Sequence, residues 1–175
     1  MTLTLDDFVD DTPWTPSAAE FADLSMPDPI AGVRVQRLPS HRDERGELTV
    51  LLTSLRDASL TTPHAYHVVA ESRSIRAWVY HRRQSDRLAY VDGLFRLALY
   101  DLRPESPTLG RMNVLDVGAE NRVLVTIPPY VIHGLQNRSG RAAYFVNMPT
   151  RAYDPSWPDK SRLPYGHPGI PYVFD

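Results

Sequence analysis

Prolines separate short apolar runs along the whole chain, and this pattern restricts the fold more than any other feature. The sequence has 16 prolines among 175 residues, spread from Pro13 to Pro171. Proline breaks the interior of a helix and is tolerated in sheets only at edges, strand starts and bulges. We therefore expect many short strands joined by turns, and no long helices.

The apolar runs between these prolines follow the alternation of strands. From residue 31 apolar and polar residues alternate with a period of two, which is typical of strands that are buried on one face. Asp92-Gly93 is a hairpin signal, because such turns require positive φ. Runs spaced in this way predict an all-β sandwich or barrel. The predicted strands are 33–38, 47–55, 65–72, 74–81, 86–93, 94–102, 121–128 and 142–149.

The two ends of the chain differ from the middle. We interpret residues 1–25 as an N-terminal arm, with Ser17 as a candidate N-cap of a short helical turn, and residues 26–175 as a single domain. The proline-rich tail contains Trp157 and Tyr165 among other aromatic residues. Such a tail is too apolar to remain free, so we expect it to wrap around the barrel as an ordered strap.

Composition narrows the classes of partner. The net charge is −2, so no basic field favours nucleic acid or an anionic membrane. The chain has no cysteine, which excludes disulfides and thiolate chemistry. No apolar run is as long as a membrane span, and the acidic start lacks the pattern of a signal peptide. We expect a cytoplasmic protein with a small-molecule ligand.

The stretch "IPPYVIHGLQN" contains the first candidate functional group. Pro128, His133 and Asn137 have the spacing of the second cupin motif. This spacing predicts a strand, a turn fixed by proline and a second strand that directs His133 into the mouth of a barrel. A histidine with a purely structural role near a strand end is the alternative interpretation.

A series of segments then resembles one family. The segments "DERGELTV", "IRAWVYH", "DRLAYVDG", "ALYDLRPESPTLG", "GAENRVLVTIPPYVIHGLQN" and "RAYDP" occur in this order. Together they are similar to the dTDP-4-dehydrorhamnose 3,5-epimerase family across residues 27–171. The resemblance implies a cupin jelly roll and a homodimer with strand exchange near the N-terminus. It also implies action on nucleotide-linked 4-keto-6-deoxy sugars without a metal or other cofactor.

The resemblance assigns binding roles to several residues. Arg76 matches an arginine expected to contact phosphate or the keto oxygen, and Arg45 matches one that reaches toward the diphosphate. Arg87 stands where the family has lysine, which keeps the charge but changes its geometry. His133 and Asn121 match the family as they stand.

The catalytic positions depart from the family pattern. Val79 occupies the position of the catalytic histidine, and the orienting acid aligns best with His167. The acid tyrosine falls at Asn147 or Met148. Neither valine nor these two side chains can exchange a proton usefully, so the usual proton transfers need other groups.

Nearby residues offer replacements for these groups. His81 lies two residues after Val79, on the same face of a strand. We therefore predict epimerisation or isomerisation through an enolate, in which His81 and His133 move the proton or polarise the carbonyl. Tyr153 or Tyr144 is the predicted acid. Trp78, together with Val79, is expected to make the cavity more apolar.

Two other interpretations stay open. One is a repurposed cupin that catalyses a different isomerisation or cyclisation on a natural-product intermediate, or that only binds a ligand. A metal-dependent cupin is the other alternative, because His81, Asp86 and His133 supply two imidazoles and a carboxylate.

Overall fold

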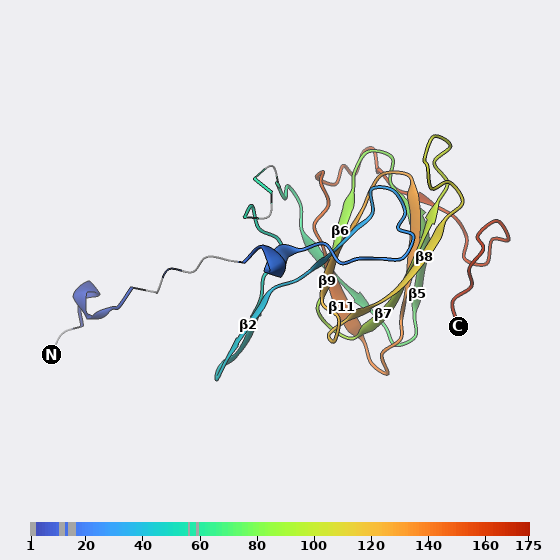
Figure 1. The fold of residues 1–175 in the computed structure, drawn as a ribbon. Helices are drawn as coiled ribbons and strands as arrows, with labels where there is room; N and C mark the ends of the chain where they lie inside the picture. Colours follow the sequence, from blue (N-terminus) through green and yellow to red (C-terminus); the bar gives the residue numbers. More distant parts are fainter. Residues whose placement is uncertain (1–2, 11–12, 14–16, 56, 59) are drawn as a thin grey trace.

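The predicted all-β jelly roll is confirmed in a computed structural model that describes residues 3–10, 13, 17–55, 57–58 and 60–175. Figure 1 shows a barrel of antiparallel strands with the chain's N-terminal segment extending away from it. Within the described ranges the only helical segments are two 3₁₀ turns, η1 (Leu5–Asp7) and η2 (Ala18–Phe21). None of them is long and apolar enough to cross a membrane.

Two five-stranded sheets form the barrel in the described part of the chain. The first sheet has the order β1 (Arg34–Arg37), β9 (Val123–Ile127), β6 (Asp86–Tyr90), β11 (Ala143–Asn147) and β4 (Tyr66–Ala70). The second has the order β12 (Ser161–Arg162), β5 (Ile75–Tyr80), β10 (Val131–Asn137), β7 (Leu94–Asp101) and β8 (Met112–Gly118). A separate hairpin joins β2 (Ser40–Asp43) to β3 (Gly46–Thr49).

Alternating side chains of both sheets fill the space between them. On β7, Phe95, Leu97 and Leu99 are completely buried in the main core cluster. The ring of Tyr90 from the first sheet lies 5.5 Å from that of Phe95 and 5.3 Å from that of Phe145. One end of the barrel is therefore closed by packed aromatic rings, and polar side chains are left to the other end.

The tail covers the outer face of the second sheet, as the aromatic composition predicts. Trp78 on β5 is 1% exposed and stacks on Phe174 with ring centroids 5.3 Å apart. Ile170 belongs to the same buried cluster. This packing fixes the last third of the tail and leads residues 157–163 across the mouth of the barrel.

Two strand predictions need correction. The predicted strand 47–55 ends at Thr49, because Leu51 and Leu52 leave the hairpin and pack on the outer face of the first sheet. Strand β8 was not predicted, although Val117 is buried and the strand pairs with all of β7 from Leu94 to Tyr100. Its charged and amide residues obscured the alternation.

The N-terminal segment reaches the barrel before residue 26. Asp23 forms an isolated bridge with Gln36, and Leu24 and Met26 pack against the main core. Ser17 precedes η2 but makes no side-chain capping bond. The division into an arm of residues 1–25 and a domain of residues 26–175 stays a prediction.

Candidate functional site

Three titratable side chains meet at the mouth of the barrel. His133 comes from β10, Asp86 begins β6, and His81 directly follows β5. Oδ2 of Asp86 lies 3.2 Å from Nε2 of His81 and 3.3 Å from Nε2 of His133. The two imidazole rings are nearly parallel, with centroids 6.0 Å apart. All three side chains are buried, so these contacts operate with little solvent screening.

The second nitrogen of each imidazole is held by the backbone. Nδ1 of His81 is hydrogen-bonded to the carbonyl oxygen of Asp159, and Nδ1 of His133 to the carbonyl oxygen of Val131 at 3.2 Å. A carbonyl oxygen can only accept, so each Nδ1 carries the hydrogen. The neutral form of each ring therefore presents a bare Nε2 to Asp86.

The carboxylate of Asp86 is held from its other side. Nε2 of Gln84 donates to Oδ1 of Asp86 at 2.9 Å. Burial acts to raise the pKa of Asp86, but the hydrogen bonds and charge that His133 and His81 supply in their protonated form outweigh it, so this pKa lies well below its usual value. Asp86 is therefore a carboxylate at neutral pH.

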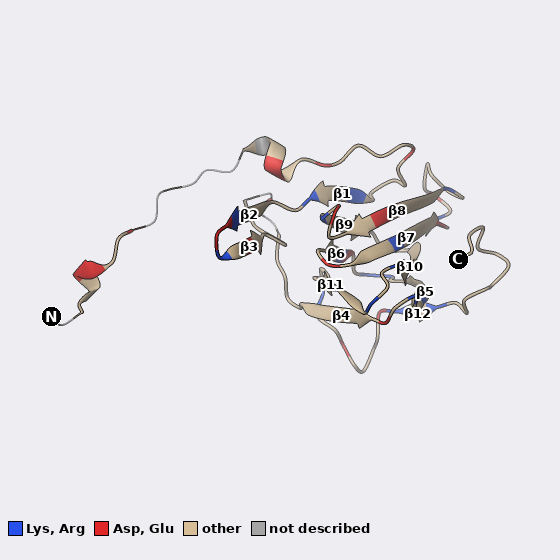
Figure 2. Ribbon diagram, turned by 90° about the horizontal axis from the view of Figure 1, so that it is seen from below, with Lys and Arg blue, Asp and Glu red and all other residues tan. Residues whose placement is uncertain are grey.

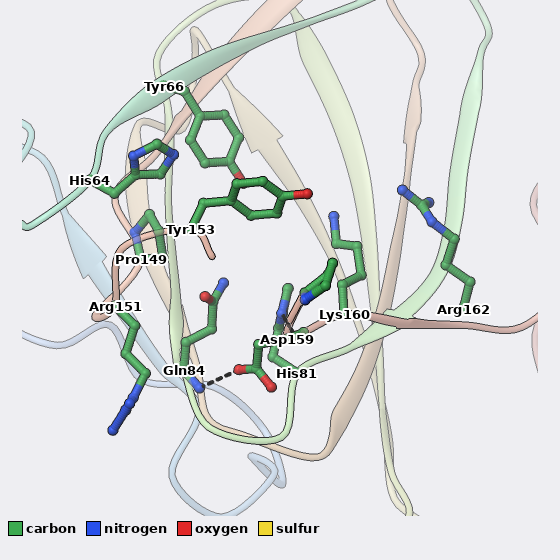
Figure 3. A pocket seen from close by; sticks show the side chains of 11 residues that line it. His64, Tyr66, His81, Gln84, Pro149, Arg151, Tyr153, Asp159, Lys160 and Arg162 are labelled. Carbon is green, nitrogen blue, oxygen red and sulfur yellow. Dashed lines mark hydrogen bonds between the residues drawn. The ribbon is translucent and has the colours of Figure 1, made fainter. Parts of the chain in front are cut away.

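Two adjoining cavities open beside this cluster. The first cavity, of about 480 Å³, is shown in Figure 3 and is lined by His81, Gln84, Tyr153 and Asp159 among others. The second cavity, of about 300 Å³, is lined by Asp86, His133 and Val79 among others. Both volumes suit a small ligand. The residues that line both cavities are Tyr66, Lys160 and Arg162.

Three cationic side chains line the second cavity. Arg76 lines the second cavity, and Lys160 and Arg162 line both. Among the ion pairs of the described residues, none involves any of these three. They are therefore available to an anionic group such as a phosphate.

The amine of Lys160 points into the space between Tyr153 and Arg162 in Figure 3. Desolvation by the cavity walls lowers the pKa of Lys160, and the positive charges of Arg162 and Arg76 lower it further, against the attraction of Asp86. The pKa of this amine therefore lies below that of an ordinary lysine. A neutral amine can accept a proton.

A phenol lies beside Asn147, and Asn147 and Met148 are the two residues at which we expect the family's acid. Asn147 on β11 is directly opposite Tyr66 on β4. Nδ2 of Asn147 donates to the hydroxyl oxygen of Tyr66 at 2.9 Å. Desolvation and the charge of Asp86 raise the pKa of Tyr66, which keeps its hydroxyl protonated.

The structure brings several of the predicted site residues together. His81, His133, Arg76, Val79 and Tyr153 all line one of the two cavities. Val79 is the direct neighbour of His133 in the ladder between β5 and β10. Val79, the expected position of the family's catalytic histidine, thus lies inside the site and is apolar.

Trp78 and Arg87 point away from the two cavities. Each is adjacent in its strand to a residue that faces a cavity, so the alternation of a strand turns it outward. Trp78 packs under the tail on the outer face of the second sheet. Arg87 is buried and donates to the carbonyl oxygens of Met148, Thr61 and Pro149. The guanidinium of Arg87 is therefore occupied by these backbone carbonyl groups.

Four further predicted residues lie away from the cluster. Tyr144 faces outward on β11, where its ring is next to that of His67. Asn121 donates to the carbonyl oxygen of Asp116 in the turn before β9. His167 accepts a hydrogen bond from the amide of Gly169 in the exposed tail. Arg45 is paired with Asp43 at the turn of the β2–β3 hairpin, which protrudes from the barrel in Figure 1.

Sequence reasoning missed Lys160, Arg162 and Tyr66. Lys160 and Arg162 lie in a polar part of the tail with no periodicity, so no local pattern distinguishes them from exposed loop residues. Tyr66 alternates correctly with Val68, which also faces the second cavity. That alternation was a usable signal for Tyr66.

The fold and the site define a jelly-roll protein of the cupin type, with a ligand cavity that joins titratable groups to cationic side chains. Comparison with known sequences then gives the family. A sequence profile of dTDP-4-dehydrorhamnose 3,5-epimerase matches residues 27–165, and the chain belongs to this family. Membership indicates epimerase or isomerase activity on nucleotide sugars.

Known proteins agree with this assignment. The spore coat polysaccharide biosynthesis protein SpsL of Bacillus subtilis is 33% identical over 140 residues, which are 78% of this chain and 90% of SpsL. The "Probable low-salt glycan biosynthesis epimerase Agl13" of Haloferax volcanii is 32% identical over 142 residues, which are 80% of this chain and 90% of Agl13.

A solved structure shows the same architecture. The dTDP sugar isomerase of Desulfovibrio desulfuricans G20 superimposes with a TM-score of 0.76 at 25% sequence identity. The superposition covers 82% of this chain and 91% of that one. This chain thus has the same fold as that isomerase.

Proposed function

We propose that this protein epimerises or isomerises a nucleotide-linked 4-keto-6-deoxy sugar at a carbon next to the keto group, through an enolate. The observation that carries the proposal is the buried cluster of His81, Asp86 and His133 beside a cavity lined by three cations. Enolate formation places negative charge on the keto oxygen, and fixed polar groups in a buried site stabilise such charge strongly.

The proposed roles follow from where each group points. Both Nε2 atoms face Asp86, so the two histidines are poorly placed to take a proton from carbon. We assign the two imidazoles to the keto oxygen instead, to which each can donate a hydrogen bond only when its Nε2 carries a proton. Lys160, whose amine points into the cavity, is the proposed base. Arg76 and Arg162 are proposed to bind the diphosphate, as bidentate partners of phosphate oxygens.

A phenol is proposed to return the proton. Tyr153 and Tyr66 both line the first cavity, and Figure 3 shows their hydroxyl groups on the same side of it as the amine of Lys160. The Tyr66→Phe and Tyr153→Phe variants separate these two candidates. The variant that lacks the acid retains exchange of the substrate proton but loses inversion of the carbon.

A homodimer in the cytoplasm is part of the same proposal. Figures 1 and 2 show the β2–β3 hairpin projecting from the barrel with acidic and basic residues at its turn. Arg45 of one chain cannot reach the cluster of the same chain. If Arg45 binds the diphosphate, it therefore has to come from a second copy of the chain. Light scattering during gel filtration gives the mass in solution, and a monomer would contradict this part of the proposal.

The experiment that tests the function is proton NMR of dTDP-4-keto-6-deoxyglucose in deuterium oxide. We expect the signal at carbon 3 or carbon 5 to disappear faster with the protein than in buffer. His133→Ala should slow this exchange, whereas His67→Ala, which removes an outward-facing imidazole, should leave it unchanged. Absence of exchange at saturating protein would overturn the proposed reaction, and absence of dTDP binding would overturn the proposed substrate class.

A further inference from the structure

We propose that His81, Asp86 and His133 form a binding site for one divalent transition-metal ion of the zinc and iron(II) type. The ligand atoms of the three residues lie within 4.8 Å of one another, and all three side chains are buried. Two imidazoles and one carboxylate are a ligand set suited to such ions. This inference concerns binding and stands whether or not the proposed reaction is correct.

The spacing of the three ligand atoms fits a shared ion. A metal held at about 2.1 Å by nitrogen and oxygen places neighbouring ligand atoms roughly 3.0 to 3.4 Å apart. The two observed distances from Oδ2 of Asp86, 3.2 Å to His81 and 3.3 Å to His133, lie in this range. The third pair, the two imidazole nitrogens, lies within 4.8 Å, so a shift of the imidazole side chains brings the three atoms around one centre.

The hydrogen bonds of the imidazoles favour the same conclusion. Both Nδ1 atoms donate to backbone carbonyl oxygens, so the neutral rings direct two Nε2 lone pairs at one carboxylate oxygen. Nε2 of His81 is buried without a hydrogen-bond partner among the described residues. Two lone pairs that face a carboxylate repel it, and either protons on the rings or a metal cation between the three atoms removes this repulsion. Backbone carbonyls that hold the opposite nitrogen are the usual support for metal-bound histidines.

The carboxylate of Asp86 is also oriented by a hydrogen bond. Gln84 donates to Oδ1 of Asp86 and leaves Oδ2 for the two imidazoles. A hydrogen bond to the second oxygen of a ligating carboxylate fixes its direction toward the ion. Gln84 is therefore a positioning residue in this proposal, and it is itself 8% exposed.

Nearby cations do not exclude the ion. Arg76 and Arg162 are exposed to solvent, which screens their repulsion. Asp86 and His133 line the second cavity and His81 lines the first, so open coordination positions face both. If the proposed function is also correct, the keto oxygen of the sugar occupies one of them and the ion supplies Lewis-acid stabilisation of the enolate.

The test uses cobalt(II), whose absorption bands report its ligands. The untagged protein is stripped with chelator and titrated with Co²⁺ in the absence of any sugar. We expect one Co²⁺ per chain, displacement by Zn²⁺, and a rise in melting temperature on binding. His133→Ala and His81→Ala should each weaken binding more than about 100-fold, and Gln84→Ala about 10-fold.

Matched controls and contrary outcomes make the test decisive. His64→Ala removes an imidazole that lines the first cavity outside the cluster, and it should bind Co²⁺ like the unmodified protein. Circular dichroism verifies the fold of each variant, and His81→Asn replaces any variant that fails to fold. Absence of Co²⁺ binding at 100-fold excess over protein, about 10⁻³ M, or unchanged binding in both histidine variants, overturns the proposal. Neither result depends on sugar turnover.

Discussion

The carbonyl oxygen of Asp159 accepts a hydrogen bond from Nδ1 of His81, 78 residues earlier in the chain. The side chain of the same aspartate accepts the backbone amides of Arg82 at 3.1 Å and of Arg83 and Gln84 at 2.9 Å each. One residue of the tail thus orients an imidazole of the cluster and fixes the turn that follows it. It also determines where the next residue, Lys160, enters the cavity.

Removal of the Asp159 side chain should loosen this part of the tail. Asp159→Ala leaves three backbone amides without their acceptor, so we expect the free energy of unfolding to fall by about 1–3 kcal/mol. The displacement of Lys160 should lower the rate of proton exchange by more than the loss of stability explains. Urea unfolding and the NMR exchange assay measure the two effects.

A second aspartate in the tail provides the control. Asp154 accepts the amides of Ser156 and Trp157 in an exposed turn. Asp154→Ala should cost at most about 1 kcal/mol and leave exchange unchanged. Equal effects of the two substitutions on exchange would contradict the role given to Asp159.

Replacement of Lys160 tests the proposed base. Lys160→Met should lower the rate of exchange by about 10²–10⁴-fold, the usual range for a general base. Lys160→Arg keeps the positive charge but cannot release a proton in this pH range, so it should be as slow as the methionine variant. Comparable activity of the arginine variant and the unmodified protein would show that only the charge matters.

The pH profile gives a second readout for Lys160. A base must be neutral to act, so kcat/KM should increase as pH rises through the pKa of the amine. Desolvation lowers this pKa from the ordinary value of 10.5, and the increase should therefore be complete at a lower pH than for an exposed lysine. Rates measured from pH 6 to pH 10, an interval of about four units that ends below the usual lysine pKa, locate the pKa of this amine.

The fold was predictable because its signal is local. Several strands carry their own alternation, as in Phe95, Leu97 and Leu99, and several turns carry a proline or glycine. The alternation of side chains along a strand also predicts which residues face away from the site, but the site prediction did not use it. Arg87 lies between Asp86 and Leu88 and must face away from both, as Trp78 must face away from Val79.

The site itself was only partly predictable, since its geometry depends on contacts between distant segments. His133 follows from its spacing to Pro128 on a strand that the sequence defines. Lys160 reaches the cavity only because Asp159 anchors the tail to the turn after β5, and no local pattern encodes that contact. Tyr66 becomes relevant through its partner Asn147, which lies 81 residues away.

Gly134 should not tolerate a side chain. A Cβ at this position would lie 2.5 Å from Cβ of Ala77 and 2.9 Å from Cε3 of Trp78, on the neighbouring strand β5. Gly134→Ala should therefore push β10 away from β5 and destabilise the fold by about 1–3 kcal/mol. Because Gly134 follows His133, metal binding and exchange should weaken as well. Gly140→Ala, which meets no atom within 4 Å, is the control and should be close to neutral.

Asp101 should account for part of the acid sensitivity of the fold. Its side chain is completely buried and accepts hydrogen bonds from Arg103, Ser106 and Thr108, which fix the loop after β7. Burial opposes the charge, but these three donors more than offset burial and hold the pKa of Asp101 below its usual value. Asp101→Asn should lower the free energy of unfolding by about 3 kcal/mol at pH 7, because Arg103 loses its buried partner.

The sign of the pH dependence follows from the lowered pKa. The folded protein keeps Asp101 ionised at pH values where the unfolded chain takes up a proton. The stabilisation is therefore complete above about pH 5, and it is lost as pH falls below about 4 toward the folded-state pKa. The difference between Asp101→Asn and the unmodified protein in urea unfolding should shrink over that interval. Asp116→Asn, which breaks a half-exposed pair with Arg96, should cost less than about 1 kcal/mol throughout. A difference for Asp101→Asn that stayed constant from pH 7 to pH 3, a range of about four units, would show that the loop is held by shape and not by the charge of Asp101.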